Sequence, residues 1–244
     1  MPDGLLRFAR YAFPPNVRGL CGPDRSDDLA GAIAAGTPDP ELVGIARGFS
    51  GAWPYLQLLA STLSEGRALD SRVVDGYWLA DPAAGAVPVS ALGDSLRDRF
   101  SKRDGWSGLA DSIPAGGWPV HAYHVFLVYP WIGLIRSGSV DPGLTVVDRC
   151  RIRWGTVLEV IGASALVSTD RLAWDGHRVV AGERRIEEVS IHHERRRIDP
   201  GMTVSMHWDW VCEPISEETR RHLEAAQSHH LALANRLEVM KRLY

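Results

Sequence analysis

One cysteine and one histidine in the second half of the chain have the residue types needed to hold a soft metal ion. Cys150 stands before the first of several short alternating runs, and His207 lies late in the last of them. A cysteine thiolate suits iron and other thiophilic metals, and imidazole binds many of the same ions. If the runs are strands that curl into a small barrel, both side chains meet at one rim. Cys150 is therefore a candidate ligand for a soft metal, and His207 is expected to lie beside it.

Arginines flank Cys150 on both sides, and their positive charge is expected to lower the pKa of the thiol and to favour the thiolate. If this segment is a strand, the arginines share one face of it, where they would attract an anionic cargo or a partner. The competing interpretation is a buried, inert strand cysteine. The residues predicted to contact a partner are Arg149, Arg151, Arg153, Trp154 and Trp208.

Three further residues are candidate metal ligands. His121 and His124 are three residues apart, so they share a face if the segment is helical. No cysteine or carboxylate stands at a matching spacing nearby, and buried packing or hydrogen-bonded histidines are the alternative. Cys21 lies in a turn-rich loop with Gly22 and Pro23, where it is either a reactive thiol or a small residue in a tight turn.

The segments between Cys150 and His207 are typical of strands. Val157 and Val167 flank a glycine-bearing turn at 161–164, and the Asp175-Gly176 pair is a strong signal for a second hairpin. Residues 204–210 alternate apolar and polar side chains, which predicts one strand with a buried face. A further strand at 144–148 is expected to lead into Cys150. Several short strands with regular turns predict a small, OB-like barrel.

The first part of the chain is predicted to be mostly helical, with caps such as Asp70 and a first helix that ends at Pro14-Pro15. Ser216 caps a final amphipathic helix that has acidic residues in its first turn. The fold class is therefore α+β. The predicted domains are a helical domain at 1–140, a small β-barrel at 141–215 and a C-terminal helix at 216–244 that packs on the rest.

The segment at about 144–230 resembles the HypC/HupF family of hydrogenase assembly chaperones, which are small barrel proteins. The resemblance implies that Cys150 helps to hold an iron unit that bears cyanide and carbon monoxide, with His207 beside it. It also implies a carrier or chaperone rather than an enzyme, and a hydrogenase large-subunit precursor or a maturation scaffold protein as partner. The residues at the family's spacings are Cys150, Gly155, Val157, Val160, Gly162, Ala165, Val167, Gly201, Val204, His207 and Ile215.

Composition excludes several other classes of function. The formal net charge of the 244-residue chain is -3, which argues against nucleic acid or an anionic membrane as a partner. The three cysteines form no CxxC pair, and the N-terminal residues lack a signal-peptide pattern. We therefore expect reduced thiols and a cytoplasmic location.

Two other functions stay open at this stage. The helical domain and the barrel could enclose the pocket of a small-molecule enzyme that uses His121, His124, Tyr129 and Cys21, although no known catalytic motif is present. The barrel could also bind an oligonucleotide, but the net acidity counts against this. The basic run at 195–197 is interpreted as a solvated loop, with a docking patch for an acidic partner as the alternative.

Overall fold

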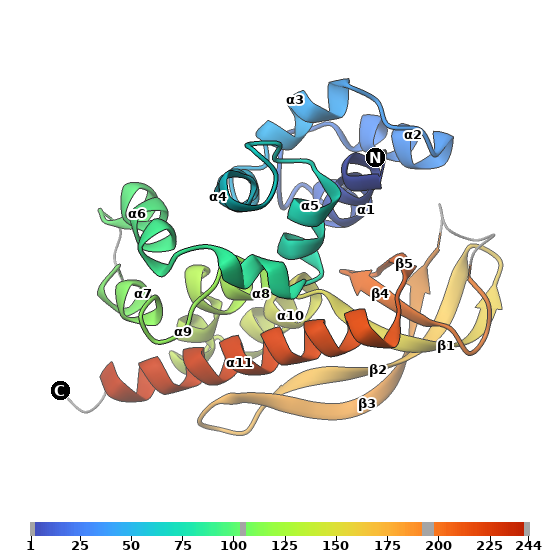
Figure 1. Cartoon of the computed structure of the whole chain (residues 1–244). Helices are drawn as coiled ribbons and strands as arrows, with labels where there is room; N and C mark the ends of the chain where they lie inside the picture. Colours follow the sequence, from blue (N-terminus) through green and yellow to red (C-terminus); the bar gives the residue numbers. More distant parts are fainter. Residues whose placement is uncertain (1–2, 103–105, 192–197, 242–244) are drawn as a thin grey trace.

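The computed structural model describes residues 3–102, 106–191 and 198–241, and the α+β class is confirmed (Figure 1). Short helices precede a five-stranded sheet, and a long helix follows it. The basic run at 195–197 lies outside the described residues. The helical elements before the sheet are α1 (Asp3–Asn16), α2 (Ser26–Ala35), α3 (Glu41–Arg47), α4 (Trp53–Leu63), α5 (Ser71–Trp78), η1 (Pro82–Ala86), α6 (Val89–Phe100), α7 (Trp106–Ser112), α8 (His121–Tyr123), η2 (His124–Val128), α9 (Trp131–Arg136) and α10 (Val140–Cys150).

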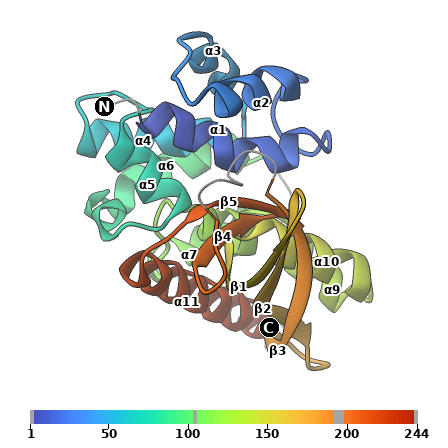
Figure 2. The ribbon, with the colours of Figure 1, turned by 90° about the vertical axis from the view of Figure 1, so that its right-hand side faces the viewer.

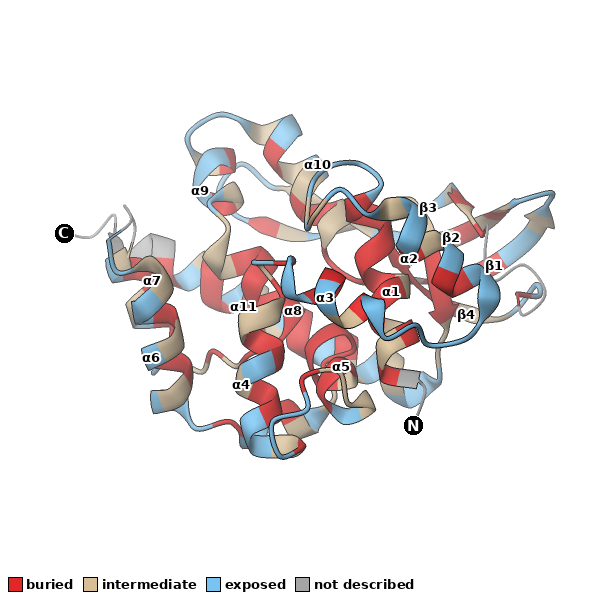
Figure 3. Cartoon of the chain, turned by 90° about the horizontal axis from the view of Figure 1, so that it is seen from above, coloured by how far each residue is buried: buried red, intermediate tan, exposed pale blue. Residues whose placement is uncertain are grey.

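Helix α1 links the first helices to the sheet. It packs against α2, α3 and α5 and also against two strands (Figure 2). Its Phe8 and Tyr11 side chains are fully buried. Buried residues gather where the helices face one another, while their outer sides are exposed (Figure 3). The first helix therefore connects the helical core with the strands that carry His207.

The two prolines near the end of α1 do not stop it where the sequence predicted. The helix continues through Pro14 and Pro15 to Asn16. Proline lacks the N–H that would bond to the carbonyl four residues earlier, so the carbonyls of Arg10 and Tyr11 lose their helical hydrogen bonds to residues 14 and 15. Packing of the buried face outweighs this local cost, and the Tyr11 carbonyl is left for another donor.

The five strands form a sheet that closes on itself in the order β1-β2-β3-β5-β4. Strand β1 pairs with both β2 and β4, and a single parallel pair, Ser190 with Trp210, joins β3 to β5. A second, smaller core that includes Val167 and Met206 fills the inside of the sheet. The strands are β1 (Arg153–Ile161), β2 (Ser164–Trp174), β3 (Val179–Ser190), β4 (Thr203–His207) and β5 (Trp210–Pro214).

The first two hairpins form where the sequence predicted them. Gly162 supplies the positive φ of the β1–β2 turn, and residues 175–178 connect β2 to β3. Because Trp174 pairs with Val179, the second connection is a loop of four residues. Within this loop only Gly176 has a positive φ. The Asp175 carboxylate fixes this loop by accepting hydrogen bonds from the backbone N–H groups of residues 177 and 178, each at 2.9 Å.

The strand predicted at 144–148 is wrong. These residues belong to α10, which ends at Cys150, and the sheet begins only at Arg153 rather than at 141. Residues 145–147 are β-branched and favour a strand locally. As a helix, however, the segment buries Val147 completely and packs against α9. Cys150 therefore lies at the end of a helix and not at the entry of a strand.

The single strand predicted at 204–210 is also wrong. The chain turns at Trp208 and Asp209, so that β4 and β5 form a third hairpin in which His207 pairs with Trp210. Trp208 takes a φ of 54°, a left-handed conformation that is rare for a bulky residue. This turn places His207 at the end of a strand.

The predicted C-terminal helix is present as α11 (Glu217–Lys241). The backbone N–H of Thr219 donates to the Ser216 hydroxyl at 3.1 Å, as expected for a cap. The helix runs across the molecule and contacts α7, α8, η2 and β3 (Figure 1). It therefore spans the helical part and the sheet.

Candidate metal centre

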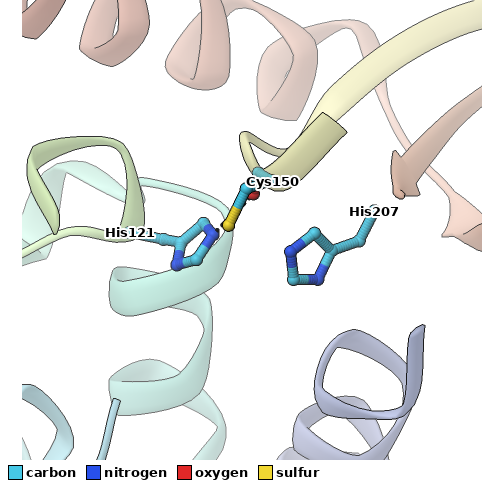
Figure 4. A group of neighbouring side chains, drawn as sticks. All are labelled: His121, Cys150 and His207. Carbon is cyan, nitrogen blue, oxygen red and sulfur yellow. Dashed lines mark hydrogen bonds between the residues drawn. The ribbon is translucent and has the colours of Figure 1, made fainter. Parts of the chain in front are cut away.

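Three side chains from distant parts of the chain converge beside α1. His121 is the first residue of α8, Cys150 the last of α10, and His207 the last of β4 (Figure 4). Each offers one ligand atom, and these atoms all lie within 4.8 Å of one another. The structure thus brings together the predicted pair, Cys150 and His207, and adds His121. Among the described residues this is the one such group, and Cys21 and His124 are not part of it.

The proton of His207 is placed by a backbone carbonyl. Its Nδ1 lies 2.7 Å from the carbonyl oxygen of Tyr11. Because a carbonyl only accepts, Nδ1 carries the hydrogen and Nε2 carries the lone pair. Nε2 is buried and has no hydrogen-bond partner among the described residues, and the side chain is 1% exposed. A metal ligand has this arrangement, with one ring nitrogen oriented by a carbonyl and the other available.

The carbonyl that orients His207 is available because of Pro15. In an uninterrupted helix the N–H of residue 15 would bond to the oxygen of residue 11, and proline has no N–H. The Tyr11 side chain is fixed as well, since its hydroxyl lies 2.7 Å from the Ser205 hydroxyl and 3.1 Å from a carboxylate oxygen of Glu213. Helix α1 is thus attached to β4 at two points, through the Tyr11 hydroxyl and through the Tyr11 carbonyl, and the carbonyl sets the ring of His207.

His121 is oriented in the same manner. Its Nε2 lies 2.8 Å from the carbonyl oxygen of Cys150. The last carbonyls of a helix have no partner within it, so the end of α10 can accept this hydrogen bond. Nε2 therefore carries the hydrogen, and Nδ1 keeps its lone pair, with the Tyr77 hydroxyl 3.4 Å away. Both histidines thus have a tautomer that is fixed by a backbone carbonyl. His207 keeps an unpartnered Nε2, whereas Nδ1 of His121 lies beside the Tyr77 hydroxyl.

Burial sets the charge of all three candidate ligands. It lowers the pKa of His121 to about 4 and that of His207 well below its usual value, so both rings are neutral at pH 7. Burial, with a smaller contribution from Cys21, raises the pKa of Cys150 to about 12. The predicted lowering of the Cys150 pKa by arginines is therefore wrong. The metal-free protein holds a thiol, and a bound cation would displace its proton.

Two of the flanking arginines lie in the interior and have partners of their own. The Arg151 guanidinium donates to Asp148 at 2.9 Å, and Arg153 donates to Glu187 at 2.7 Å. Arg151 is 6% exposed and Arg153 is not exposed at all. A partner protein cannot reach them in this conformation, which corrects the prediction for these two residues. Their charge is compensated locally, so it does not offset the burial of Cys150.

The other residues of the predicted partner-binding set are more peripheral. Arg149 pairs with Asp209 in the β4–β5 turn and is partly exposed. Trp154 is half-buried on β1. Trp208 is 9% exposed and its ring faces a cavity, so it lines the site rather than an outer surface. Only Arg149 and Trp154 of the set are therefore accessible to a partner.

An apolar cavity of about 180 Å³, here called the inner cavity, adjoins the three ligands. Cys21, His124 and Tyr129 also line it, together with the rings of Trp78 and Trp208. The donor set of two neutral imidazoles and one thiol suits zinc, iron or cobalt. Three protein ligands leave at least one coordination position for another group. The residues present thus fit a metal centre that faces the inner cavity.

Fold and site together define an α+β protein with a buried His-Cys-His candidate metal centre between its helices and its sheet. The chain belongs to DUF6390, a family of unknown function, and the match covers residues 1–241. Neither the curated proteins nor the solved structures contain a significant match to it. Every helix among the described residues is too short or too polar to cross a lipid bilayer.

Some contributors to the site carry no sequence signal of that role. Tyr11 acts through its backbone, and Pro15 acts by lacking an N–H, so neither resembles a functional residue. Sequence spacing relates His121 only to His124, because no cysteine or carboxylate stands nearby in sequence. Its actual neighbours come from α10 and β4, which only tertiary packing places beside α8.

Proposed function

We propose that this protein is a HypC-like assembly factor for a hydrogenase, a carrier rather than an enzyme. In this role Cys150 and His207 hold an iron unit that is the cargo, and a partner protein receives it. The observation that supports the proposal best is the convergence of a thiol with two imidazoles, whose ligand atoms all lie within 4.8 Å of one another. The residues that resemble the HypC/HupF family also include Cys150, before the first strand, and His207, at the end of β4.

The chemistry of the site suits such a cargo. Thiolate and imidazole are ligands that iron accepts readily. The inner cavity, about 180 Å³, is roughly ten times the ~15 Å³ that one water molecule requires by the same measure. Its mostly apolar lining favours small ligands of low polarity, such as carbon monoxide, over water. An iron unit that already bears diatomic ligands would therefore fit beside the three side chains.

The proposed partners are a hydrogenase large-subunit precursor or a maturation scaffold protein. The proposal for them comes from the resemblance alone. Cys150 is half-buried although its thiol lies among buried groups, and the proposed route for cargo transfer is a local opening at the end of α10. Arg149 and Trp154 are the predicted partner contacts that stay accessible.

The test is an anaerobic purification from cells that assemble a hydrogenase, with infrared spectra in the cyanide and carbon monoxide stretching region and metal analysis. We expect iron and diatomic bands in the wild type and their loss in Cys150→Ser. Cys21→Ser is the matched control, because Cys21 lines the same cavity but lies outside the ligand group. A Cys150→Ser variant that supports full hydrogenase maturation in cells would refute the proposal.

A small-molecule enzyme is the second candidate. The observation that favours it is that His121, His124, Tyr129 and Cys21 all line the inner cavity. On this alternative the cavity binds a substrate and the metal, if any, stays bound. Full metal retention when hydrogenase precursor is added, with no protein partner recovered, would favour the enzyme over the carrier.

A further inference from the structure

A second and wider cavity, here called the outer cavity, adjoins the inner one. Its volume is about 640 Å³, and it is more open to solvent. The two cavities share lining residues that include Gly51, His124 and Tyr129. Two cationic side chains, Arg47 and Arg99, line the outer cavity, and no acidic residue does so among the described residues. Its electrostatic character is therefore positive and uncompensated.

The Arg99 guanidinium lies against two aromatic rings and forms no ion pair with a described residue. Its guanidinium carbon lies 4.8 Å from the ring centre of Tyr55 and 4.7 Å from that of Phe100. Nη2 makes a long contact of 3.4 Å to the Ser50 carbonyl, and the Tyr55 hydroxyl is a further hydrogen-bond neighbour of the guanidinium. Nη1 is buried without a hydrogen-bond partner among the described residues. A buried donor left without an acceptor is costly, more so when it is charged. An acceptor supplied by a ligand would remove this cost.

His124 contributes a second unpartnered atom at the boundary of the two cavities. The side chain is 4% exposed, and its Nε2 has no partner among the described residues. Its Nδ1 lies 3.4 Å from the Tyr55 hydroxyl, so the tautomer with hydrogen on Nε2 is available when this hydroxyl donates. His124 starts η2, a π-helical turn of the type that often occurs at functional sites.

Gly51 keeps the space in front of these atoms open. A Cβ at this position would lie 3.2 Å from His124 Nε2 and 3.6 Å from the Tyr129 hydroxyl oxygen. Gly51 has no positive φ, so backbone conformation does not require glycine here. The absence of a side chain instead preserves access to two polar atoms from the cavity.

We propose that the outer cavity binds a small organic anion. A carboxylate or phosphate group accepts hydrogen bonds from Arg99 Nη1 and His124 Nε2, and the rings of Trp53 and Phe100 cover the apolar body of the ligand. Charge-assisted hydrogen bonds of this type are about twice as strong as neutral ones. Because His124 lines both cavities, the bound anion lies at the boundary with the inner cavity. This inference does not depend on the proposed hydrogenase role.

The experiment is calorimetric titration of the metal-free full chain with three probes: benzoate, phenyl phosphate and inorganic phosphate. We expect at least one aromatic probe to bind, and Arg99→Gln to weaken its binding by about tenfold or more, as for loss of a charged hydrogen bond. Gly51→Ala should weaken it as well. The matched control is Arg97→Gln on the same helix, since Arg97 is exposed and already pairs with Asp94 at 2.9 Å. This control should change affinity less than about twofold.

Each outcome decides the proposal. Benzoate binding without phenyl phosphate binding identifies a carboxylate, and the reverse identifies a phosphate. If inorganic phosphate binds as tightly as either aromatic probe, the inference that the ligand has an organic body is wrong. No binding of any probe at about 10 mM, or equal affinity in wild type and Arg99→Gln, overturns the site. If Arg99→Gln does not fold by circular dichroism, Arg99→Lys keeps the charge and should still lose affinity, because one ammonium cannot reproduce the fork of the guanidinium.

Discussion

Replacing Pro15 by alanine should weaken metal binding although residue 15 is no ligand. Alanine restores an N–H that points at the Tyr11 carbonyl and competes with His207 Nδ1 for it. Once that 2.7 Å hydrogen bond is weakened, the ring can rotate or carry its hydrogen on Nε2, which blocks the lone pair. A hydrogen bond contributes about 0.5–1.5 kcal/mol, and loss of a ligand's orienting partner costs about 10–100-fold in metal affinity. A tenfold loss of metal affinity corresponds to about 1.4 kcal/mol, which lies at the upper end of the first range and the lower end of the second, so we expect a loss of about tenfold.

The assay is competition between the protein and a chelator for Co²⁺ under anaerobic conditions, read by the thiolate-to-cobalt charge-transfer band. Pro14→Ala is the matched control, because its new N–H points at the Arg10 carbonyl rather than at Tyr11. We expect Pro14→Ala to bind like the wild type. Thermal unfolding of both variants checks that the helix is intact. Equal Co²⁺ affinity for Pro15→Ala and Pro14→Ala would refute the role assigned to the Tyr11 carbonyl.

Two further predictions concern the stability of the metal-free protein. Burial lowers the pKa of His230 from 6.5 to about 3. Between these pH values the unfolded chain binds a proton that the folded chain excludes. The contribution of neutral His230 to the free energy of unfolding is therefore complete above pH 6.5 and is lost as the pH falls towards 3. His230→Leu should therefore remove about 2 kcal/mol of the difference in unfolding free energy between pH 7.5 and pH 5, measured with urea, and an unchanged difference would contradict this assignment. Arg153→Met should destabilise the protein by about 3 kcal/mol, because it leaves the buried Glu187 with only Arg171. Arg184→Met removes an exposed pair and should leave the urea midpoint unchanged, so equal effects of the two arginine variants would count against the buried pair.

Local patterns were sufficient for the parts of this fold that depend on neighbouring residues. The turns at Gly162 and Gly176 require a positive φ, which glycine adopts without strain, so both hairpins could be placed from the sequence. The cap at Ser216 likewise depends on atoms within one turn of helix. The sequence also predicted that Cys150 and His207 lie close together, provided that the strands between them curl into a closed sheet.

The same local patterns failed where burial decided the outcome. Residues 145–147 favour a strand by propensity, but as part of helix α10, which packs against α9, Val147 is completely buried. The arginines beside Cys150 suggested a thiolate, but Arg151 and Arg153 are compensated by Asp148 and Glu187 inside the protein. A pKa depends on which charges and how much solvent surround a group in three dimensions, and the order of residues does not give either.

The sequence by itself determined which side chains could bind a metal, where the first two hairpins turn and where the last helix begins, because these properties depend on residue type and short-range geometry. Only the tertiary structure decided that His121 completes the group and that the Tyr11 and Cys150 carbonyls set both histidine tautomers. It also decided that the thiol stays protonated without a metal. These features depend on packing α1, α8, α10 and β4 around one point, and the burial created there controls both the charge and the orientation of the ligands.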